Sequence, residues 1–220
     1  MTPKMLKERR ARFLKLDRAL KKLFPNVGTE LKAKTPWQFM VAVQLSAQCT
    51  DKRVNLVTKE LFKKYKTIDD YARAGQDELA RAINSVTYYH NKARNIIAAA
   101  KFVKKEYDGK LPKTMAQMTA IPGVGRKTAN VVLADVYGIT PGITVDTHVI
   151  RFVARFNLSD YRDAVRIERD LIEIVPKKEW RLFTHRVIHY GRYMAPARVH
   201  DNSRDPLIKI YPPAAKKFRV

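Results

Sequence analysis

Helical periodicity runs along almost the whole of this chain, and the alternating β-branched pattern of half-buried strands is nearly absent. The segment 129–136 places its apolar residues at positions i, i+3, i+4 and i+7, and the segment 164–174 shows the same helical period. Residues spaced in this way share one face of an α-helix, whereas a strand that faces a core has a period of two. The pattern therefore predicts an all-α fold.

Prolines, glycines and capping residues predict where these helices begin and end. A basic amphipathic helix is expected over residues 3–23, ending before Pro25, and Pro36 suits the first turn of the next helix. Thr114 opens a capping-box pattern ahead of a short helix. Further helices are expected at about 52–65, 76–84, 89–107, 126–137, 147–156, 163–175 and 178–193. The last stretch, 196–220, reads as irregular and is expected to wrap over the surface.

The charge of the chain indicates a polyanionic partner. Its 220 residues carry 44 Lys and Arg against 21 Asp and Glu, a formal net charge of +23. Such an excess raises the local concentration of nucleic acid and speeds the encounter with it. Charge alone is also compatible with a chromatin-like or ribosomal binding protein, or with a surface that is charged only for solubility. Only the sequence motifs can distinguish an enzyme from these alternatives.

Cysteine usage and hydropathy limit the compartment and the cofactors. The single cysteine, Cys49, cannot form an intramolecular disulfide or supply a four-cysteine cluster, which fits a reducing compartment. The segment 1–16 is too charged for a signal peptide, and no stretch approaches eighteen uninterrupted apolar residues. The expected location is the cytoplasm, in association with the nucleoid and without membrane contact.

Residues 121–127, with the sequence IPGVGRK, form the most informative motif. Gly123 and Gly125 permit backbone angles that other residues resist, so a tight turn can point successive N–H groups outward at the start of the next helix. These amides suit a phosphate and read no base edges. A monovalent cation that bridges the turn and the phosphate is compatible with the motif. An ordinary helix-turn-helix corner is the alternative that the two glycines alone leave open.

Lys127 lies in the first turn after the hairpin, next to Arg126, and Asp146 follows on a later element. Positive charge from Arg126 and the helix dipole disfavours an ammonium group there, and a nucleophile needs the neutral amine. Asp146 would accept a proton from Lys127 or stabilise positive charge developing on a sugar. The structural alternatives are a phosphate contact for Lys127 and a helix N-cap for Asp146, and the two roles of Asp146 are compatible.

Five segments together carry a family resemblance. They are QLSAQCTDKRVN at 44–55, YYHNKARNI at 88–96, IPGVGRKTANVVL at 121–133, VDTHVIRF at 145–152 and HYGRY at 189–193. In this order they resemble bacterial endonuclease III, of the helix-hairpin-helix glycosylase superfamily, over about residues 30–194. The resemblance implies a two-domain, all-α helix-hairpin-helix DNA glycosylase fold with the active site in the interdomain cleft. It assigns residues 29–138 to a six-helix domain, and residues 1–28 and 139–220 to a discontinuous second domain.

The resemblance also implies a mechanism and a set of DNA contacts. In that family the hairpin lysine, here Lys127, attacks C1′ of the damaged nucleotide, forms a Schiff base and cuts the strand by β-elimination, while the aspartate, here Asp146, assists. Gln48 matches the residue that fills the space left by the flipped base. Tyr88 stands at the position of a leucine wedge, where an aromatic ring can stack on the orphan base, and Thr87 replaces a common glycine. The complete set of expected DNA-binding residues is Gln48, Tyr88, His90, Lys92, Gly123, Gly125 and Arg126.

The largest departure from the family pattern lies near the C-terminus. Endonuclease III usually ligates a [4Fe–4S] cluster there with four cysteines, whereas this chain has Ala195, Asn202 and Asp205 where the first three would fall. No cluster and no other metal site is expected. Because the family's cluster lies away from the reacting lysine, the chemistry is expected to be independent of it. The basic tail residues expected to contact phosphates in its place are Arg198, Arg204 and Lys209.

These inferences predict a bifunctional DNA glycosylase and AP lyase of base excision repair that acts as a monomer on damaged double-stranded DNA. Oxidised pyrimidines such as thymine glycol are the expected lesions. Two alternatives stay open: a related glycosylase for 8-oxoguanine or a mismatched base, and a non-catalytic helix-hairpin-helix DNA-binding protein. In the second alternative, Lys127 contacts a phosphate and Asp146 is only a helix cap.

Overall fold

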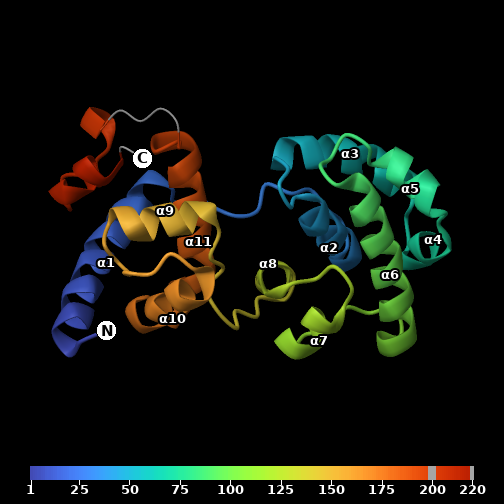
Figure 1. Ribbon diagram of the computed structural model, residues 1–220, viewed down its shortest axis with the longest axis horizontal. Coiled ribbons are helices and arrows are strands. Elements are labelled where there is room, and N and C mark those ends of the chain that lie inside the picture. The colour runs from blue at the N-terminus through green and yellow to red at the C-terminus, as the bar shows by residue number, and fades with distance from the viewer. Residues whose placement is uncertain (198–201, 219–220) are drawn as a thin grey trace. The chain divides into compact units, whose positions relative to one another are not determined.

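The computed structural model describes residues 1–197 and 202–218, and within these residues the regular structure is helical, with no strand. The chain divides into two compact units, Thr29–Pro141 and a discontinuous unit made of Met1–Gly28 and Gly142–Val220 (Figure 1). Over the described ranges, no helix is long and apolar enough to cross a membrane. The all-α prediction is confirmed.

The unit Thr29–Pro141 is built around α2 (Pro36–Leu45), in which every residue after the initial proline is buried. Its other buried residues, apart from Gln38 and Gln44, are apolar, and a helix that is apolar on most sides belongs inside a bundle and not on its surface. Thr35 caps this helix by accepting a hydrogen bond from the Gln38 N–H at 3.2 Å, and Pro36 occupies its first turn. The helices packed against α2 are α3 (Asp51–Lys64), α6 (Tyr89–Tyr107) and α8 (Arg126–Tyr137).

Three shorter helices complete this unit. α4 (Ile68–Arg73) and α5 (Gln76–Ala82) pack against α6, and α7 (Met115–Ala120) packs against α8. No sequence pattern predicted α4, because six residues are too few to show a helical period. Its one local signal is a capping box: Thr67 Oγ1 accepts from the Asp70 N–H at 3.3 Å, and the Asp70 carboxylate accepts from the Thr67 N–H at 2.8 Å.

The discontinuous unit joins the N-terminal helix to C-terminal ones. Its main helices are α1 (Pro3–Leu23), α9 (Thr147–Arg155), α10 (Ala164–Ile174) and α11 (Trp180–His189), with a 3-10 turn, η1 (Lys177–Glu179), before α11. Aromatic rings lie at the centre of its core. The ring of Phe183 packs edge to face against those of Phe13 and Phe152, with distances between ring centroids of 5.3 Å and 6.0 Å. The helix predicted to run to residue 193 ends at His189 and continues as a π-helical turn, η2 (Tyr190–Met194).

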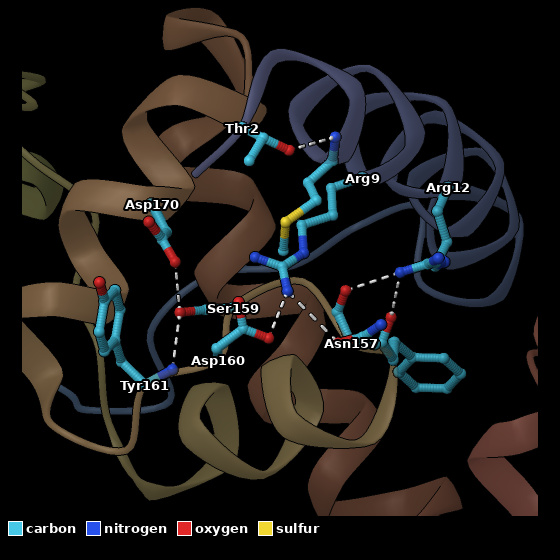
Figure 2. Close-up of polar contacts among 10 residues, drawn as sticks. Thr2, Arg9, Arg12, Asn157, Ser159, Asp160, Tyr161 and Asp170 are labelled. Carbon is cyan, nitrogen blue, oxygen red and sulfur yellow. Dashed lines mark hydrogen bonds and ion pairs between the residues drawn. The ribbon is translucent and has the colours of Figure 1, made fainter.

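Two arginines of α1 fasten it to the segment that follows α9 (Figure 2). The buried Arg9 guanidinium donates to Asp160 Oδ1 at 2.6 Å, and Arg12 donates to the Asn157 carbonyl at 2.6 Å. Asn157 has a φ of 51°, in the left-handed region that asparagine tolerates better than most residues. These contacts explain why the first helix belongs to the same unit as the C-terminal helices.

The C-terminal segment was predicted to be irregular and to wrap over the surface. Most of its described residues are exposed or half-buried, but the segment also contributes side chains to the core of this unit, which the sequence did not predict. It contains two 3-10 turns, η3 (Asn202–Arg204) and η4 (Pro212–Phe218), and η4 packs against α9. The side chains of Leu207 and Ala214 are fully buried. Leu207 and Ala214 are seven residues apart, which is a helical spacing, but Pro212 and Pro213 interrupt the stretch between them. The sequence was therefore read as irregular, and the burial of these two residues was not predicted.

Candidate functional site

The hairpin between α7 and α8 is held in place by the core of its own unit. Ile121 and Val124 are buried, and the Val124 N–H donates to the Ile121 carbonyl at 3.0 Å. Gln44 of α2 donates from Nε2 to the Pro122 carbonyl at 3.2 Å. Gln44 therefore supports the hairpin, a role that was not predicted from the sequence. Its only signal was that it is one of two glutamines, with Gln38, inside a largely apolar helix.

The two hairpin glycines differ in what they permit. Gly123 has a φ of +73°, and a Cβ there would lie 2.8 Å from the Asn95 Cβ and 3.0 Å from Gln44 Nε2, so both the backbone angle and the space require glycine. Gly125 has φ −83° and ψ 173°, which any residue adopts, and a Cβ there would meet no atom within 4 Å. The prediction that both glycines adopt angles that other residues resist is therefore wrong for Gly125. Neither its backbone angles nor the space around it in the protein require glycine.

The start of α8 presents its backbone and two cations to solvent. Gly125 is the N-cap residue and has no side chain with which to cap the helix, and Arg126 and Lys127 follow as its first two residues. The N–H groups of a first helical turn have no carbonyl partner within the helix. Because Gly125, Arg126 and Lys127 are all exposed, an anion and a reactant have access to the same turn.

Asp146 lies in the other unit, at the start of α9. Its backbone is extended, and its Oδ1 accepts a hydrogen bond from the Val149 N–H at 2.9 Å. The N-cap role suggested by the sequence is therefore confirmed. The cap uses one carboxylate oxygen of a half-buried side chain, so it is compatible with a chemical role for the same group.

Arg151, further along α9, interacts electrostatically with Asp146. Burial lowers the pKa of Arg151, and the Asp146 carboxylate opposes that shift. The guanidinium donates to the carbonyls of Gly191 at 3.3 Å and Ala195 at 3.4 Å, which ties α9 to η2. A Cβ at position 191 would lie 2.4 Å from His148 Nδ1, so the close approach of these elements requires glycine. No sequence signal pointed to this role of Arg151.

Gln48 and Tyr88 are exposed residues with left-handed backbone angles, φ 53° and φ 56°. Such angles are uncommon for residues other than glycine and persist where the surroundings enforce them. The Thr87 hydroxyl donates to the Gln48 carbonyl at 2.9 Å, so the turn before α6 is bonded to the turn after α2. The two turns present both side chains to solvent, with Tyr88 63% exposed.

Lys92 does not occupy the exposed position expected of a DNA contact. Its side chain is buried, and its Nζ donates to the carbonyls of Leu45 at 2.8 Å and Ala47 at 2.7 Å. Burial lowers the pKa of Lys92. The ammonium group donates hydrogen bonds to carbonyls at the C-terminal end of α2, because the last carbonyls of a helix have no partners within it. The assignment of Lys92 to the DNA-binding surface is therefore corrected.

Other predicted contacts lie on the surface. His90 is exposed, with its ring 4.1 Å from the Tyr89 ring. Arg204 and Lys209 are exposed as well, while Arg198 lies outside the described residues. Across residues 1–197 and 202–218, no group of three His, Cys, Asp or Glu side chains is placed to hold a metal ion.

A buried polar network occupies the region where a [4Fe–4S] cluster would need cysteines. The Asp205 carboxylate forms an ion pair with Arg155 at 2.9 Å and accepts a hydrogen bond from the Tyr190 hydroxyl. Asn202 accepts a hydrogen bond from Arg155 at 3.2 Å, and Ala195 offers only a buried methyl group. A cluster needs thiolate ligands, so these residues do not fit one. The network instead bonds the C-terminal segment to α9 and η2.

The hairpin, the lysine after it and the capped aspartate place the chain in a class of helix-hairpin-helix DNA repair proteins. Residues 41–177 match the HhH-GPD superfamily of base excision DNA repair proteins, and the chain belongs to this family. Endonuclease III of Synechocystis sp. is 45% identical over 179 residues, which cover 81% of this chain and 82% of that protein. Endonuclease III of Bacillus subtilis is 42% identical over 189 residues, 86% of each chain.

A solved structure supports the same relationship. It contains a trapped endonuclease III–DNA covalent intermediate in an estranged-adenine complex. Its protein is 39% identical and superposes with a TM-score of 0.90, covering 96% of this chain and 99% of that chain. The predicted helix-hairpin-helix glycosylase fold is confirmed.

Proposed function

We propose that the chain is a bifunctional DNA glycosylase and AP lyase of base excision repair that acts on damaged double-stranded DNA. The observation that carries the proposal is the exposed Lys127 in the first turn of α8, directly after the hairpin. The second hairpin glycine, Gly125, has no protein atom within 4 Å of the position of a Cβ, so its backbone is accessible. Membership of the base excision repair superfamily supports it. A related endonuclease III has been trapped as a covalent intermediate with DNA, which supports a nucleophile in the protein.

The hairpin binds the DNA backbone in this proposal. Amide groups at the start of α8 donate to a phosphate, and the dipole of the helix adds to the attraction. Because Gly125 has no side chain and no protein atom lies near its missing Cβ, a phosphate approaches the backbone closely there. Arg126 adds a charge, and the net charge of +23 supplies binding that does not depend on sequence.

The neutral amine of Lys127 is the nucleophile. Its Nζ bonds to C1′ of the damaged nucleotide as the glycosidic bond breaks, and the base leaves after taking up a proton. Opening of the sugar ring gives a Schiff base between Nζ and C1′. Loss of a C2′ proton then expels the 3′ phosphate by β-elimination, and water releases the sugar remnant from Lys127.

Asp146 assists this attack from the start of α9. In the complex with DNA, we propose that its carboxylate stabilises positive charge developing on the sugar and takes up the proton released as the amine attacks. The hydrogen bond from the Val149 N–H holds the carboxylate in one orientation, which reduces the reorganisation needed during the reaction. Replacement by asparagine is expected to lower the single-turnover rate by about 10²-fold or more.

Gln48 and Tyr88 act on the duplex and not on the reacting bond. The damaged nucleotide leaves the base stack, Gln48 fills the space that it vacates, and the Tyr88 ring stacks on the orphan base. Both side chains are exposed on bonded turns, which suits insertion between bases. Oxidised pyrimidines such as thymine glycol are the proposed lesions.

Trapping with borohydride tests the chemistry. Duplexes with thymine glycol, 8-oxoguanine or an abasic site are mixed with the protein, and borohydride reduces a Schiff base to a stable covalent adduct. We expect adducts with the parent protein and with Lys101→Ala, an exposed lysine of α6 that serves as the matched control. Lys127→Ala is expected to form none, although it still binds damaged DNA.

The outcome also separates the alternatives. Of the two base lesions, the one that traps faster is the preferred substrate, so faster trapping on 8-oxoguanine would replace the oxidised pyrimidine assignment. The abasic duplex needs no base removal and reports the lyase step alone. An adduct that persists in Lys127→Ala would refute the role of this lysine. If no duplex gives an adduct and Lys127→Ala only reduces the salt dependence of binding by about one unit, the protein is a DNA-binding module without lyase chemistry.

A further inference from the structure

The turn after α2 is bonded to α6 by groups that the proposed chemistry does not use. Lys92 Nζ donates to the carbonyls of Leu45 and Ala47, at 2.8 and 2.7 Å. The Thr87 hydroxyl donates to the next carbonyl, that of Gln48, at 2.9 Å. Lys92 lies in the first turn of α6, and Thr87 lies in the turn just before that helix. Both side chains donate hydrogen bonds to the backbone segment that carries Gln48.

Every carbonyl of this turn is engaged. Between the two carbonyls that bind Lys92, the Ser46 carbonyl accepts from the Cys49 N–H at 3.0 Å. With the Thr87 bond, the four successive carbonyls from Leu45 to Gln48 all have donors. A fully bonded turn of this kind is able to hold Gln48 at its left-handed φ of 53°, which an unrestrained glutamine rarely adopts.

An ammonium group is well suited to this position. It carries several donors on one atom, and its positive charge is favourable near the carbonyl end of α2. Lys92 is only 8% exposed, so its two hydrogen bonds are shielded from water. The same helix places Tyr88 at its N-cap, where the φ of 56° is again left-handed, and the Lys92 N–H donates to the Tyr88 carbonyl at 3.0 Å.

We propose that Lys92 is a positioning residue which, together with Thr87, holds Gln48 and Tyr88 as a two-part probe that keeps the duplex open at the lesion. This inference rests on the proposed function, since it assumes that Gln48 and Tyr88 enter the duplex. Lys92 acts through these residues and does not contact the reacting sugar. It therefore governs extrusion of the nucleotide and leaves the bond-breaking steps unchanged.

The test compares a substrate that must be opened with one that needs no opening. Single-turnover cleavage at saturating protein is measured on a thymine glycol duplex and on a single-stranded oligonucleotide with an abasic site. Lys92→Met keeps the length of the side chain and removes its donors. We expect its rate to fall by about 10- to 100-fold on the duplex, because displaced positioning groups cost rates of this order, and by less than about twofold on the single strand.

Two further variants keep the test decisive. Thr87→Val removes the hydroxyl that donates to the Gln48 carbonyl at 2.9 Å and, at 3.4 Å, to the Ala47 carbonyl. It is expected to lower the duplex rate by about 3- to 10-fold, also without effect on the single strand. Lys101→Met removes an exposed lysine from the same helix and is expected to match the parent protein on both substrates. If Lys92→Met fails to fold, Thr87→Val decides the outcome.

Equal losses on the two substrates would overturn the proposal, because they would show that Lys92 supports the fold or the chemistry. An unchanged duplex rate in Lys92→Met, or in Thr87→Val alone, would overturn it as well. Fluorescence of 2-aminopurine opposite a non-cleavable tetrahydrofuran site reports opening without catalysis. A smaller fluorescence rise in both variants would support the positioning role even if borohydride trapping refuted the role of Lys127.

Discussion

Replacing Asp205 with asparagine removes one charge from the buried network of the discontinuous unit with almost no change of shape. Asp205 and Arg155 are each 3% exposed, and their side chains form an ion pair at 2.9 Å. In the variant, the Arg155 guanidinium stays buried and loses this counter-charge. The Tyr190 hydroxyl also loses its carboxylate acceptor. The C-terminal segment should then be held less firmly against α9.

The structure sets the size of the effect. Removing one partner of a buried ion pair costs about 3–5 kcal/mol, since the remaining charge is kept from water. Arg155 retains hydrogen bonds to the Tyr190 hydroxyl at 2.5 Å and to Asn202 at 3.2 Å, which favours the lower end of that range. We therefore expect a loss of about 3 kcal/mol, or about 1.5–2 M in the urea midpoint for a typical slope of about 1.5–2 kcal/mol per molar.

The two tryptophans allow the units to be followed separately. Trp37 lies in the unit Thr29–Pro141 and Trp180 in the discontinuous unit, and the chain has no other tryptophan. In a Trp37→Phe background, Asp205→Asn should lower the urea midpoint reported by Trp180 fluorescence. In a Trp180→Phe background, the midpoint reported by Trp37 should stay unchanged.

Asp163→Asn is the matched control for this prediction. Asp163 pairs with Arg166 in the same unit, and the two side chains are 43% and 58% exposed, so water compensates for the lost charge. Because asparagine also caps a helix, the N-cap of α10 is kept, and the change should cost no more than about 1 kcal/mol. A Trp180 midpoint in Asp205→Asn that moves no further than in Asp163→Asn would refute the argument that burial gives the Arg155 pair its strength.

Two further predictions concern the hairpin and the pH dependence of stability. Gly123→Ala should cost the unit Thr29–Pro141 about 1–3 kcal/mol by urea unfolding, because of its positive φ and the close approach of neighbouring side chains, whereas Gly125→Ala should leave stability unchanged and weaken binding to an abasic duplex in fluorescence anisotropy. Equal stability losses in the two variants would contradict the different roles assigned to these glycines. Burial alone would raise the pKa of Glu179, but hydrogen bonds from Lys21 and Arg186 outweigh it and hold the pKa below its ordinary value of 4.5. A carboxylate with a depressed pKa contributes stability above its unfolded pKa and loses it as the pH falls through the folded pKa. The Trp180 urea midpoint should therefore fall more steeply below pH 4.5 in the parent than in Glu179→Gln, and parallel curves would show that Glu179 contributes nothing to this dependence.

Local sequence signals predicted most of the helices and the candidate reacting groups. The helix at 3–23 was predicted at its observed bounds because Pro25 and a continuous helical period mark it clearly. Lys127 follows the hairpin glycines by only a few residues, so the motif predicted its position at the start of a helix. Asp146 was likewise readable as an N-cap. Such features depend on neighbours in the chain, and helix capping and periodicity are local effects.

Tertiary structure decided the roles of residues whose partners are distant in the chain. Lys92 and Lys127 are both lysines near a helix start, yet only the packing of α6 against α2 buries Lys92 against the carbonyls of Leu45 and Ala47. Gly123 and Gly125 are alike in the motif, yet only Gly123 meets side chains from α2 and α6.

The C-terminal segment shows the same division. Its sequence alone determined that no cysteine ligands are available there, because the single cysteine is Cys49. The fold alone brought Asp205 to Arg155 and Tyr190, and it buried Leu207 in a stretch that its prolines mark as irregular. Composition and local pattern determine which groups a chain can offer. Burial and ion pairing depend on desolvation by residues far away in sequence, so only the folded chain decides which of those groups face solvent and which hold the core together.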